Sequence, residues 1–366
     1  MPPVTDLIAE GERILVICNS CRYCEGFCAV FPAMERRLTF KEGDINYLAN
    51  LCHNCAECYY ACQYAPPHEF AVNVPKVLAD IRAQSYRQYA WPRFLQVNAV
   101  AAVGAGLFAA VLLAGTRSAS GANFYGVIPH NAMVGAFAVV SAFVLAVQAA
   151  GFVRFWRESG EGLGQFFQPA ILLKAARDVL SLKNLESSGA GCTYPDEHHS
   201  KGRRLFHHFT FYGFLLCTAS TTVAAAYHFS GWSAPYGYFS VPVLLGTVGG
   251  LGLLVGPAGL YALRRRRDAA IVDTAQDGMD VSFMALLFLT SLTGLLLLAF
   301  RETSAMGALL RIHLGVVLGL FFTLPYGKFV HGIYRSAALV RSALESARSR
   351  SGRTQECVSE ISRRTR

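Results

Sequence analysis

Two stretches with the same cysteine spacing decide how this chain is organised: CNSCRYCEGFC at residues 18–28 and CHNCAECYYAC at residues 52–62. Both follow the pattern C-x2-C-x2-C-x3-C, and 23 residues separate them. Together they contain eight of the eleven cysteines. Four thiols within eleven residues bring soft ligands into one small volume. The spacing therefore predicts a cysteine-rich, metal-binding domain at the N-terminus.

The spacing is that of bacterial two-cluster ferredoxins, in which the fourth cysteine of each run ligates the other cluster. On this pattern the first cluster site consists of Cys18, Cys21, Cys24 and Cys62, and the second cluster site of Cys28, Cys52, Cys55 and Cys58. Structural zinc sites space their ligand pairs more widely, and neighbouring CxxC steps give poor disulfide geometry. The usual proline after the fourth cysteine is missing, because Ala29 and Gln63 stand there. We expect two [4Fe–4S] clusters.

The composition beyond residue 91 is that of a membrane protein. The chain has 366 residues, of which only 16% are charged, and a mean hydropathy of +0.33. We expect three parts: a ferredoxin-like domain at 1–91, a membrane domain at 92–341 with a loop at 154–205, and a disordered basic tail at 342–366. The predicted fold is mainly α, with the iron–sulfur domain followed by a six-helix transmembrane, cytochrome b-like bundle.

Six apolar runs approach the ~20 residues that cross a bilayer. They are Phe94–Ala114, Ala132–Val153, Phe206–Phe229, Val241–Leu263, Val281–Phe300 and Ile312–Val330. The segments on one side of these spans, with Lys328 at the same end of the sixth span, hold 30 of the 33 Lys and Arg residues, and the other side holds only Arg117, Arg301 and Arg311. The positive-inside rule predicts a multi-pass protein of a bacterial-type inner (plasma) membrane with both termini cytoplasmic. The basic residues behind the net charge of +9 are thus distributed according to the topology in the lipid bilayer, and we expect no nucleic-acid partner.

Histidines stand at the ends of two predicted spans. His207 and His208 open the third span and His228 closes it, while His313 and His331 lie at the two ends of the sixth. Ionisable residues at such positions are functional candidates, and neutral imidazole is an axial haem ligand. His331 follows His313 by 18 positions, or five helical turns, which returns a helix to the same face. We expect His207 or His208 to pair with His331, and His228 with His313, giving one or two sites for haem b; interfacial capping by these histidines is the alternative.

Other residues give weaker signals. His53, inside the second cysteine run, is expected to be an exposed loop residue, with tuning of a cluster through a hydrogen bond as the alternative. Pro169–Leu185 is expected to form an amphipathic surface helix. Cys192 is too isolated for a cluster and is expected to be a buried or loop thiol. Arg301 and Arg311 are candidates for contact with haem propionates, or for interfacial anchors.

These features together resemble the tricarballylate utilization protein B family, also called the CitB family. The specific part of the resemblance is GAGCTYPDEHHSKGRRLFHHFTFYGFLLCTAS at residues 189–220. The last span, with PYGK at 325–328 before His331, is also similar to the haem-binding cytochrome b subunit of respiratory nitrate reductases. The resemblance covers nearly the whole chain.

The resemblance implies an oxidoreductase component. Such proteins reoxidise the reduced flavin of a separate FAD-dependent tricarballylate dehydrogenase and pass its electrons through [4Fe–4S] clusters and haem b to membrane quinone. This chain has no flavin fingerprint, so the flavin is expected in a partner. The alternatives are an electron-transfer subunit for another flavin dehydrogenase or a heterodisulfide-type enzyme, a membrane redox sensor, and a tricarboxylate transporter. The last is disfavoured because no span carries a central Arg or Lys.

Overall fold

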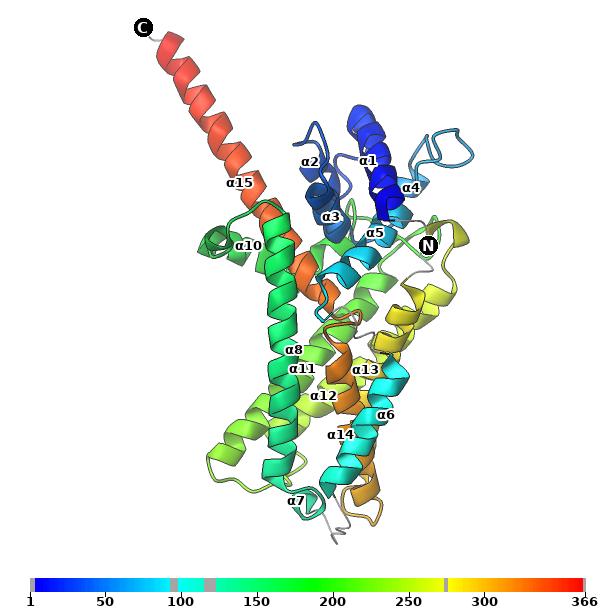
Figure 1. Ribbon diagram of the computed structural model, residues 1–366, viewed down its shortest axis with the longest axis vertical. Helices are drawn as coiled ribbons and strands as arrows, with labels where there is room; N and C mark the ends of the chain where they lie inside the picture. Colours follow the sequence, from blue (N-terminus) through cyan, green and yellow to red (C-terminus); the bar gives the residue numbers. More distant parts are fainter. Residues whose placement is uncertain (1–3, 93–97, 115–122, 273–275, 365–366) are drawn as a thin grey trace.

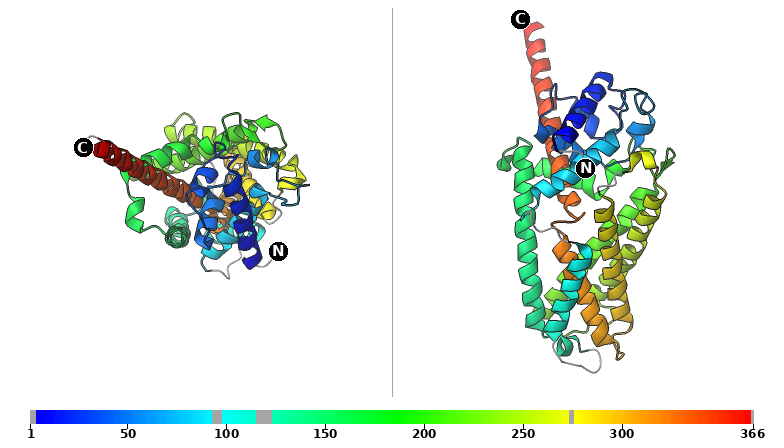
Figure 2. Two further views of the ribbon diagram at one scale, coloured as in Figure 1. Left: turned by 90° about the horizontal axis from the view of Figure 1, so that it is seen from above. Right: turned by 45° about the vertical axis from the view of Figure 1, so that its right-hand side comes forward.

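The computed structural model describes residues 4–92, 98–114, 123–272 and 276–364. A cysteine-rich domain of short helices lies at one end of a bundle of long helices, and the C-terminal helix rises past this domain (Figure 1). The second view in Figure 2 shows the same arrangement. Residues 94–97 of the first predicted span, and Arg117, lie outside the described residues.

The cysteine-rich domain is built from helices. They are α1 (Val4–Cys21), α2 (Val30–Met34), α3 (Glu42–Leu51), α4 (Glu57–Tyr60) and α5 (Val74–Tyr89). Asn73 caps α5 by accepting a hydrogen bond from the Lys76 backbone N–H, and Pro75 stands in the first turn, where no N–H is needed. No strand occurs among residues 4–92. Loops between these short helices carry most of the eight cysteines.

The bundle confirms the predicted membrane domain, although the count of six spans is approximate. Its long helices are α8 (His130–Glu158), α11 (Gly202–Phe229), α12 (Val241–Arg265), α13 (Asp277–Ala299) and α14 (Met306–Thr323). All five are long and apolar enough to cross a membrane. The sixth predicted span corresponds to α14, and the first to the shorter apolar helix α6 (Ala99–Ala114). Several of these helices extend past their apolar runs, because backbone hydrogen bonding continues through the flanking charged residues.

Small residues let neighbouring helices cross closely. A Cβ atom added to Gly213 of α11 would lie 2.9 Å from the carbonyl oxygen of Gly249 in α12. One added to Gly319 of α14 would lie 2.8 Å from the Cα of Val103 in α6. Interfaces of this kind are typical of membrane helices, where packing replaces the hydrophobic effect. They fix α11 against α12, and α14 against α6.

Short elements connect the long helices. They are α7 (Phe124–Val127), α9 (Leu163–Phe166), α10 (Pro169–Leu180), the 3-10 turns η1 (Lys183–Leu185) and η2 (Ala269–Ile271), and the strands β1 (Cys192–Thr193) and β2 (His199–Ser200). The strands pair antiparallel. The predicted surface helix at 169–185 is therefore α10 followed by a separate turn.

The C-terminal helix α15 (Val330–Arg364) differs from the predicted disordered tail. Its buried residues Ala337, Ala338 and Leu344 join the core of the cysteine-rich domain. Glu345 pairs with Arg37 and Arg341. These contacts give the Ser/Arg-rich segment after Ser342 a partner that composition alone does not reveal, so it forms helix.

Candidate functional site

The first cluster site forms around a small cavity. Cys18 and Cys21 lie in the last turn of α1, and the chain reverses at Arg22, whose φ of 54° is left-handed. The cavity has a volume of about 280 Å³, and Cys18, Cys21, Cys24 and Cys62 are among the residues that line it. Cys58, which the pattern assigns to the other cluster, also lines this cavity. The fourth cysteine of the second run, Cys62, thus lies near the three cysteines of the first.

The cysteines of the second cluster site also lie near one another. Burial and then the nearby Cys55 and Cys52 raise the pKa of Cys28. Burial also raises the pKa of Cys58, with smaller contributions from those three cysteines and from Cys24 of the first site. The left-handed residues Asn54 and Ala56, with φ of 54° and 67°, curl the loop that carries them. Non-glycine residues adopt this conformation at a cost. The proximity of Cys28 to Cys52 and Cys55 is compatible with the crossed ligand pattern, which stays a prediction.

Burial sets the thiol chemistry of both sites. Burial, with smaller contributions from the neighbouring Cys24 and Cys62, raises the pKa of Cys18 to about 12. Burial likewise raises the pKa of Cys28 and Cys58 well above the usual range. Thiols in this setting ionise when metal cations neutralise them. The donor set fits a polynuclear iron–sulfur group.

A single metal ion fits less well. No three His, Cys, Asp or Glu side chains within the described ranges are arranged to hold one ion. The sulfurs around one tetrahedral zinc lie about 3.8 Å apart. A four-iron cluster is ligated by four cysteine thiolates, and the sequence pattern supplies four to each site.

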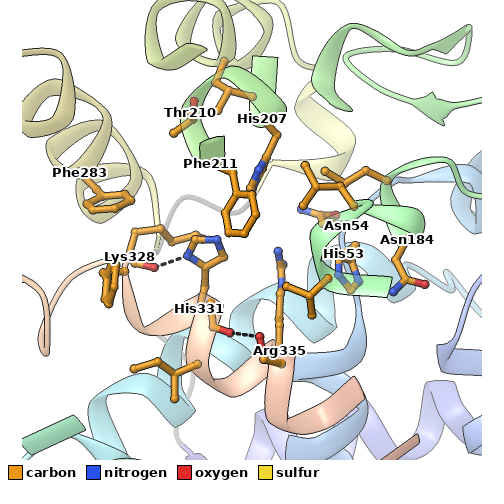
Figure 3. Close-up of a pocket in the computed structure, with 18 of the residues that line it drawn as sticks. His53, Asn54, Asn184, His207, Thr210, Phe211, Phe283, Lys328, His331 and Arg335 are labelled. Atoms are coloured by element: carbon orange, nitrogen blue, oxygen red, sulfur yellow. Dashed lines mark hydrogen bonds between the residues drawn. The ribbon is translucent and has the colours of Figure 1, made fainter. Parts of the chain in front are cut away.

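A larger cavity of about 670 Å³ lies between the second cysteine run and the membrane bundle. Figure 3 shows His207 and Phe211 from α11, His331 and Arg335 from α15, and His53 and Asn54 from the second cysteine run facing this space. Phe214 and Phe283 add apolar surface to the wall. The volume falls within the ~300–1,000 Å³ of ligand pockets. Residues of the cysteine-rich domain and residues of the bundle therefore share the wall of this cavity.

Two imidazoles face each other across this cavity. The ring centroids of His207 and His331 are 6.2 Å apart, with an interplanar angle of 73°. His331 Nδ1 lies 2.5 Å from the Lys328 carbonyl oxygen. Donation to that oxygen fixes the tautomer and leaves Nε2 free of hydrogen. Nδ1 of His207 is buried and has no hydrogen-bond partner among the described residues.

The other candidate histidines lie elsewhere. His208 stacks on Tyr212, with ring centroids 5.6 Å apart. The structure does not bring His228 to His313: His228 stacks on His130 at 4.0 Å, and His313 Nδ1 lies 3.0 Å from Thr293 Oγ1. Of the two histidines expected opposite His331, the structure brings His207 to it and not His208. The expected pair of His228 with His313 does not form.

Two residues have a different setting from the one expected. His53 is partly buried and lines the large cavity, with Nδ1 2.8 Å from the Leu51 carbonyl oxygen. Burial lowers its pKa well below the usual value, and the charge of Arg335 lowers it further. Arg301 donates a hydrogen bond to the Tyr236 carbonyl oxygen and lies over the Tyr238 ring. The position of His53 inside a cysteine run was the sequence feature that could have indicated its place in the cavity wall.

The motif at residues 189–195 packs against the second cysteine run. Thr193 donates a hydrogen bond to the Cys55 carbonyl oxygen at 3.2 Å, and Cys192 is fully buried, with its thiol donating to the Leu185 carbonyl oxygen. Just before the motif, Ser187 and Ser188 donate hydrogen bonds to the buried Glu57 carboxylate. The loop between α10 and α11 thus fastens the bundle to the second cluster site.

The fold and these sites define a membrane protein with a Fer4-like domain, an arrangement that indicates iron–sulfur electron transfer. The family model described as citrate utilization protein B matches residues 93–352, and that of its Fer4-like domain matches residues 11–90. A citrate utilization protein B of Escherichia coli is 51% identical over 362 residues, covering 95% of each chain. The chain belongs to the citrate utilization protein B family. No solved structure matches it.

Proposed function

We propose that this protein reoxidises the reduced flavin of a partner dehydrogenase and passes the electrons through two [4Fe–4S] clusters and one haem b to membrane quinone. The observation that carries the proposal is the pair of imidazoles, His207 and His331, facing each other across a cavity whose wall includes His53 and Asn54 of the second cysteine run. This arrangement supports a haem held by His207 and His331 beside the second cluster site.

The spacing of the two imidazoles fits iron between them. Two imidazoles on opposite sides of one iron have ring centroids about 6 Å apart, since each metal–nitrogen bond is about 2 Å long and each nitrogen lies about 1 Å from its centroid. The observed 6.2 Å agrees. The bound haem would supply one-electron chemistry. His207 and His331 would hold it, Lys328 would orient His331 through its carbonyl group, and Phe211, Phe214 and other apolar side chains would exclude water.

The different exposure of the cysteines at the two cluster sites supports an order for the electron carriers. Cys21 of the first cluster site is exposed, whereas Cys52 and Cys55 of the second are buried. A flavoprotein in solution therefore reaches the first site. The second site lies beside the cavity, because Arg335, one turn after His331, donates a hydrogen bond to the Cys52 carbonyl oxygen at 3.1 Å. Electrons would enter at the first site and leave through the second.

The partner we propose is an FAD-dependent tricarballylate dehydrogenase-like flavoprotein. Support comes from the family resemblance and from the name of the Escherichia coli relative, which refers to another tricarboxylate. The distribution of basic residues supports a cytoplasmic location for both termini, where a soluble flavoprotein could dock. A different flavin dehydrogenase with the same wiring is the second candidate, favoured by the general character of the two cysteine runs.

Anaerobic electron transfer tests the proposal. Full-length protein in liposomes is mixed with chemically reduced FAD, and the haem absorbance is followed before and after ubiquinone-1 is added. We expect the haem to be reduced and then reoxidised by the quinone. The Cys55→Ser variant should slow haem reduction at least tenfold, because the second cluster site loses a ligand. Failure of quinone to reoxidise the haem, or equal rates in the variant, would contradict the proposed route.

Copurification tests the choice of partner. An FAD-containing dehydrogenase that copurifies with the protein is assayed with tricarballylate and with other carboxylic acids. Activity with tricarballylate supports the proposed partner, and activity only with another acid supports the second candidate.

A further inference from the structure

Three arginines from three different helices converge on the loop of the second cluster site. Arg82 of α5 donates hydrogen bonds to the Ala49 and Cys52 carbonyl oxygens at 2.9 and 3.0 Å. Arg335 of α15 donates to the same Cys52 oxygen at 3.1 Å, and Arg203 of α11 donates to the Asn54 oxygen at 2.6 Å. We call Arg82, Arg203 and Arg335 the arginine trio. Their guanidinium groups therefore surround the backbone that carries Cys52.

The arginine trio lacks protein counter-ions. No described carboxylate lies within ion-pairing distance of its members, whereas Arg264 and Lys328 in the same cavity wall both pair with Asp280. Arg82 is only 2% exposed, and the buried Nε atoms of Arg82 and Arg335 have no hydrogen-bond partner in the described part of the chain. Buried like charges are costly unless an anion balances them. Something anionic must therefore belong beside this loop.

Hydrogen bonding to cysteine sulfur also occurs at the second cluster site. The Asn54 N–H donates to Cys52 Sγ at 3.4 Å. Within the described residues, no hydrogen-bond donor reaches a sulfur of the first cluster site. Both kinds of interaction, cations and a sulfur hydrogen bond, are thus concentrated at the second site.

We propose that the arginine trio, together with the Asn54 hydrogen bond to Cys52 Sγ, raises the reduction potential of the second cluster above that of the first. The inference rests on the proposed function, because it requires a [4Fe–4S] cluster at each site. Reduction adds one negative charge to a cluster, which burial disfavours; nearby cations and hydrogen-bond donors oppose that effect, and both are known determinants of cluster potential. When one electron moves from the first site to the second, the first is oxidised, the second is reduced and no bond or proton changes. The difference in potential directs electrons toward the haem cavity.

A redox titration followed by electron paramagnetic resonance tests this order on the anaerobic full-length protein. The signals are assigned with Cys21→Ser, which alters only the first site. Arg82→Gln should shift the reduction equilibrium of the second cluster about tenfold toward the oxidised form, which is about 59 mV for a one-electron couple. Arg82→Lys should restore most of the shift. Arg22→Gln is the matched control, because Arg22 lies in the first cysteine run, where its guanidinium donates to the Asn19 carbonyl oxygen.

A second pair of variants keeps the test valid if Arg82→Gln does not fold. Arg203 donates to the Asn54 carbonyl oxygen, whereas its neighbour Arg204 pairs with Glu186. Arg203→Gln should therefore lower the potential of the second cluster, and Arg204→Gln should not.

The outcomes separate this inference from the proposed function. Equal or reversed potentials in the unaltered protein would overturn the inference while leaving the electron route intact. A shift of the haem potential alone in Arg82→Gln would also overturn it, because the arginine trio would then serve the haem carboxylates. Absence of both clusters would instead remove the proposed function itself.

Discussion

The contact of Glu345 with the cysteine-rich domain gives a quantitative prediction. Glu345 of α15 accepts hydrogen bonds from Arg37 and from Arg341, whose Nε lies 3.1 Å away. The three side chains are only 12%, 10% and 8% exposed. Glu345→Gln removes the charge and keeps the shape, so it isolates the electrostatic part of this contact.

The size of the effect follows from burial and from the remaining partners. Removing one member of a buried ion pair costs about 3–5 kcal/mol. Asp44 remains within 2.8 Å of Arg37 and 3.2 Å of Arg341, so part of the charge stays balanced. We therefore expect a loss of about 2 kcal/mol, or about 30-fold in the equilibrium for opening the contact.

Hydrogen exchange followed by mass spectrometry measures that opening. Peptides covering residues 337–346 should exchange about 30-fold faster in Glu345→Gln. The control is Glu161→Gln, which removes the charge opposite Arg348 on the same helix; Glu161 is 8% exposed but Arg348 is 51% exposed, and pairs open to solvent contribute about 0–1 kcal/mol. Equal exchange in the two variants, or no change in Glu345→Gln, would refute the reasoning.

Two further predictions concern helix packing and acid. Gly213→Leu should lower the thermal stability of the protein in detergent, because its Cβ would lie 2.9 Å from the Gly249 carbonyl oxygen, whereas Gly104→Leu, with no atom within 4 Å, should not; similar stabilities would show that α11 and α12 do not cross this closely. Burial raises the pKa of Asp44, but hydrogen bonding to Arg37 and the charges of the nearby arginines outweigh it, so the pKa is lowered overall. A carboxylate whose pKa is lowered on folding stabilises above its unfolded value of about 3.9 and loses that contribution as pH falls through the lowered value. Pepsin should therefore cleave α15 increasingly below about pH 3.9, and Asp44→Asn should be cleaved with much less dependence on pH; identical profiles would contradict this role.

The sequence predicts the features that depend on local spacing. The cysteine pattern predicts which thiols lie together, because loop length limits where each can reach. The sequence leaves His207 and His208 open as the partner of His331, and the structure places His207 opposite it. Apolar runs locate the bundle, although helices such as α11 begin earlier than the run.

The sequence does not predict features that depend on tertiary packing. The close crossing of α11 with α12 carries the end of α11 to α8, so His228 meets His130 instead of His313. The docking of α15 did leave a signal, because Ile333, Ala337, Val340 and Leu344 follow helical periodicity. Its Ser/Arg-rich composition hid that signal. The arginine trio was invisible because its members lie far apart in the sequence.

The most direct test of the central claim is the cofactor content of the anaerobically purified protein. Non-haem iron, acid-labile sulfide and haem b are measured per chain in the unaltered protein and in His207→Ala, His331→Ala and His208→Ala. We predict about eight non-haem irons in all four proteins. One haem b should be present in the unaltered protein and in His208→Ala, and it should be lost when His207 or His331 is replaced, because the pair faces one cavity. Zinc in place of iron, or full haem retention in His207→Ala and His331→Ala, would contradict the account.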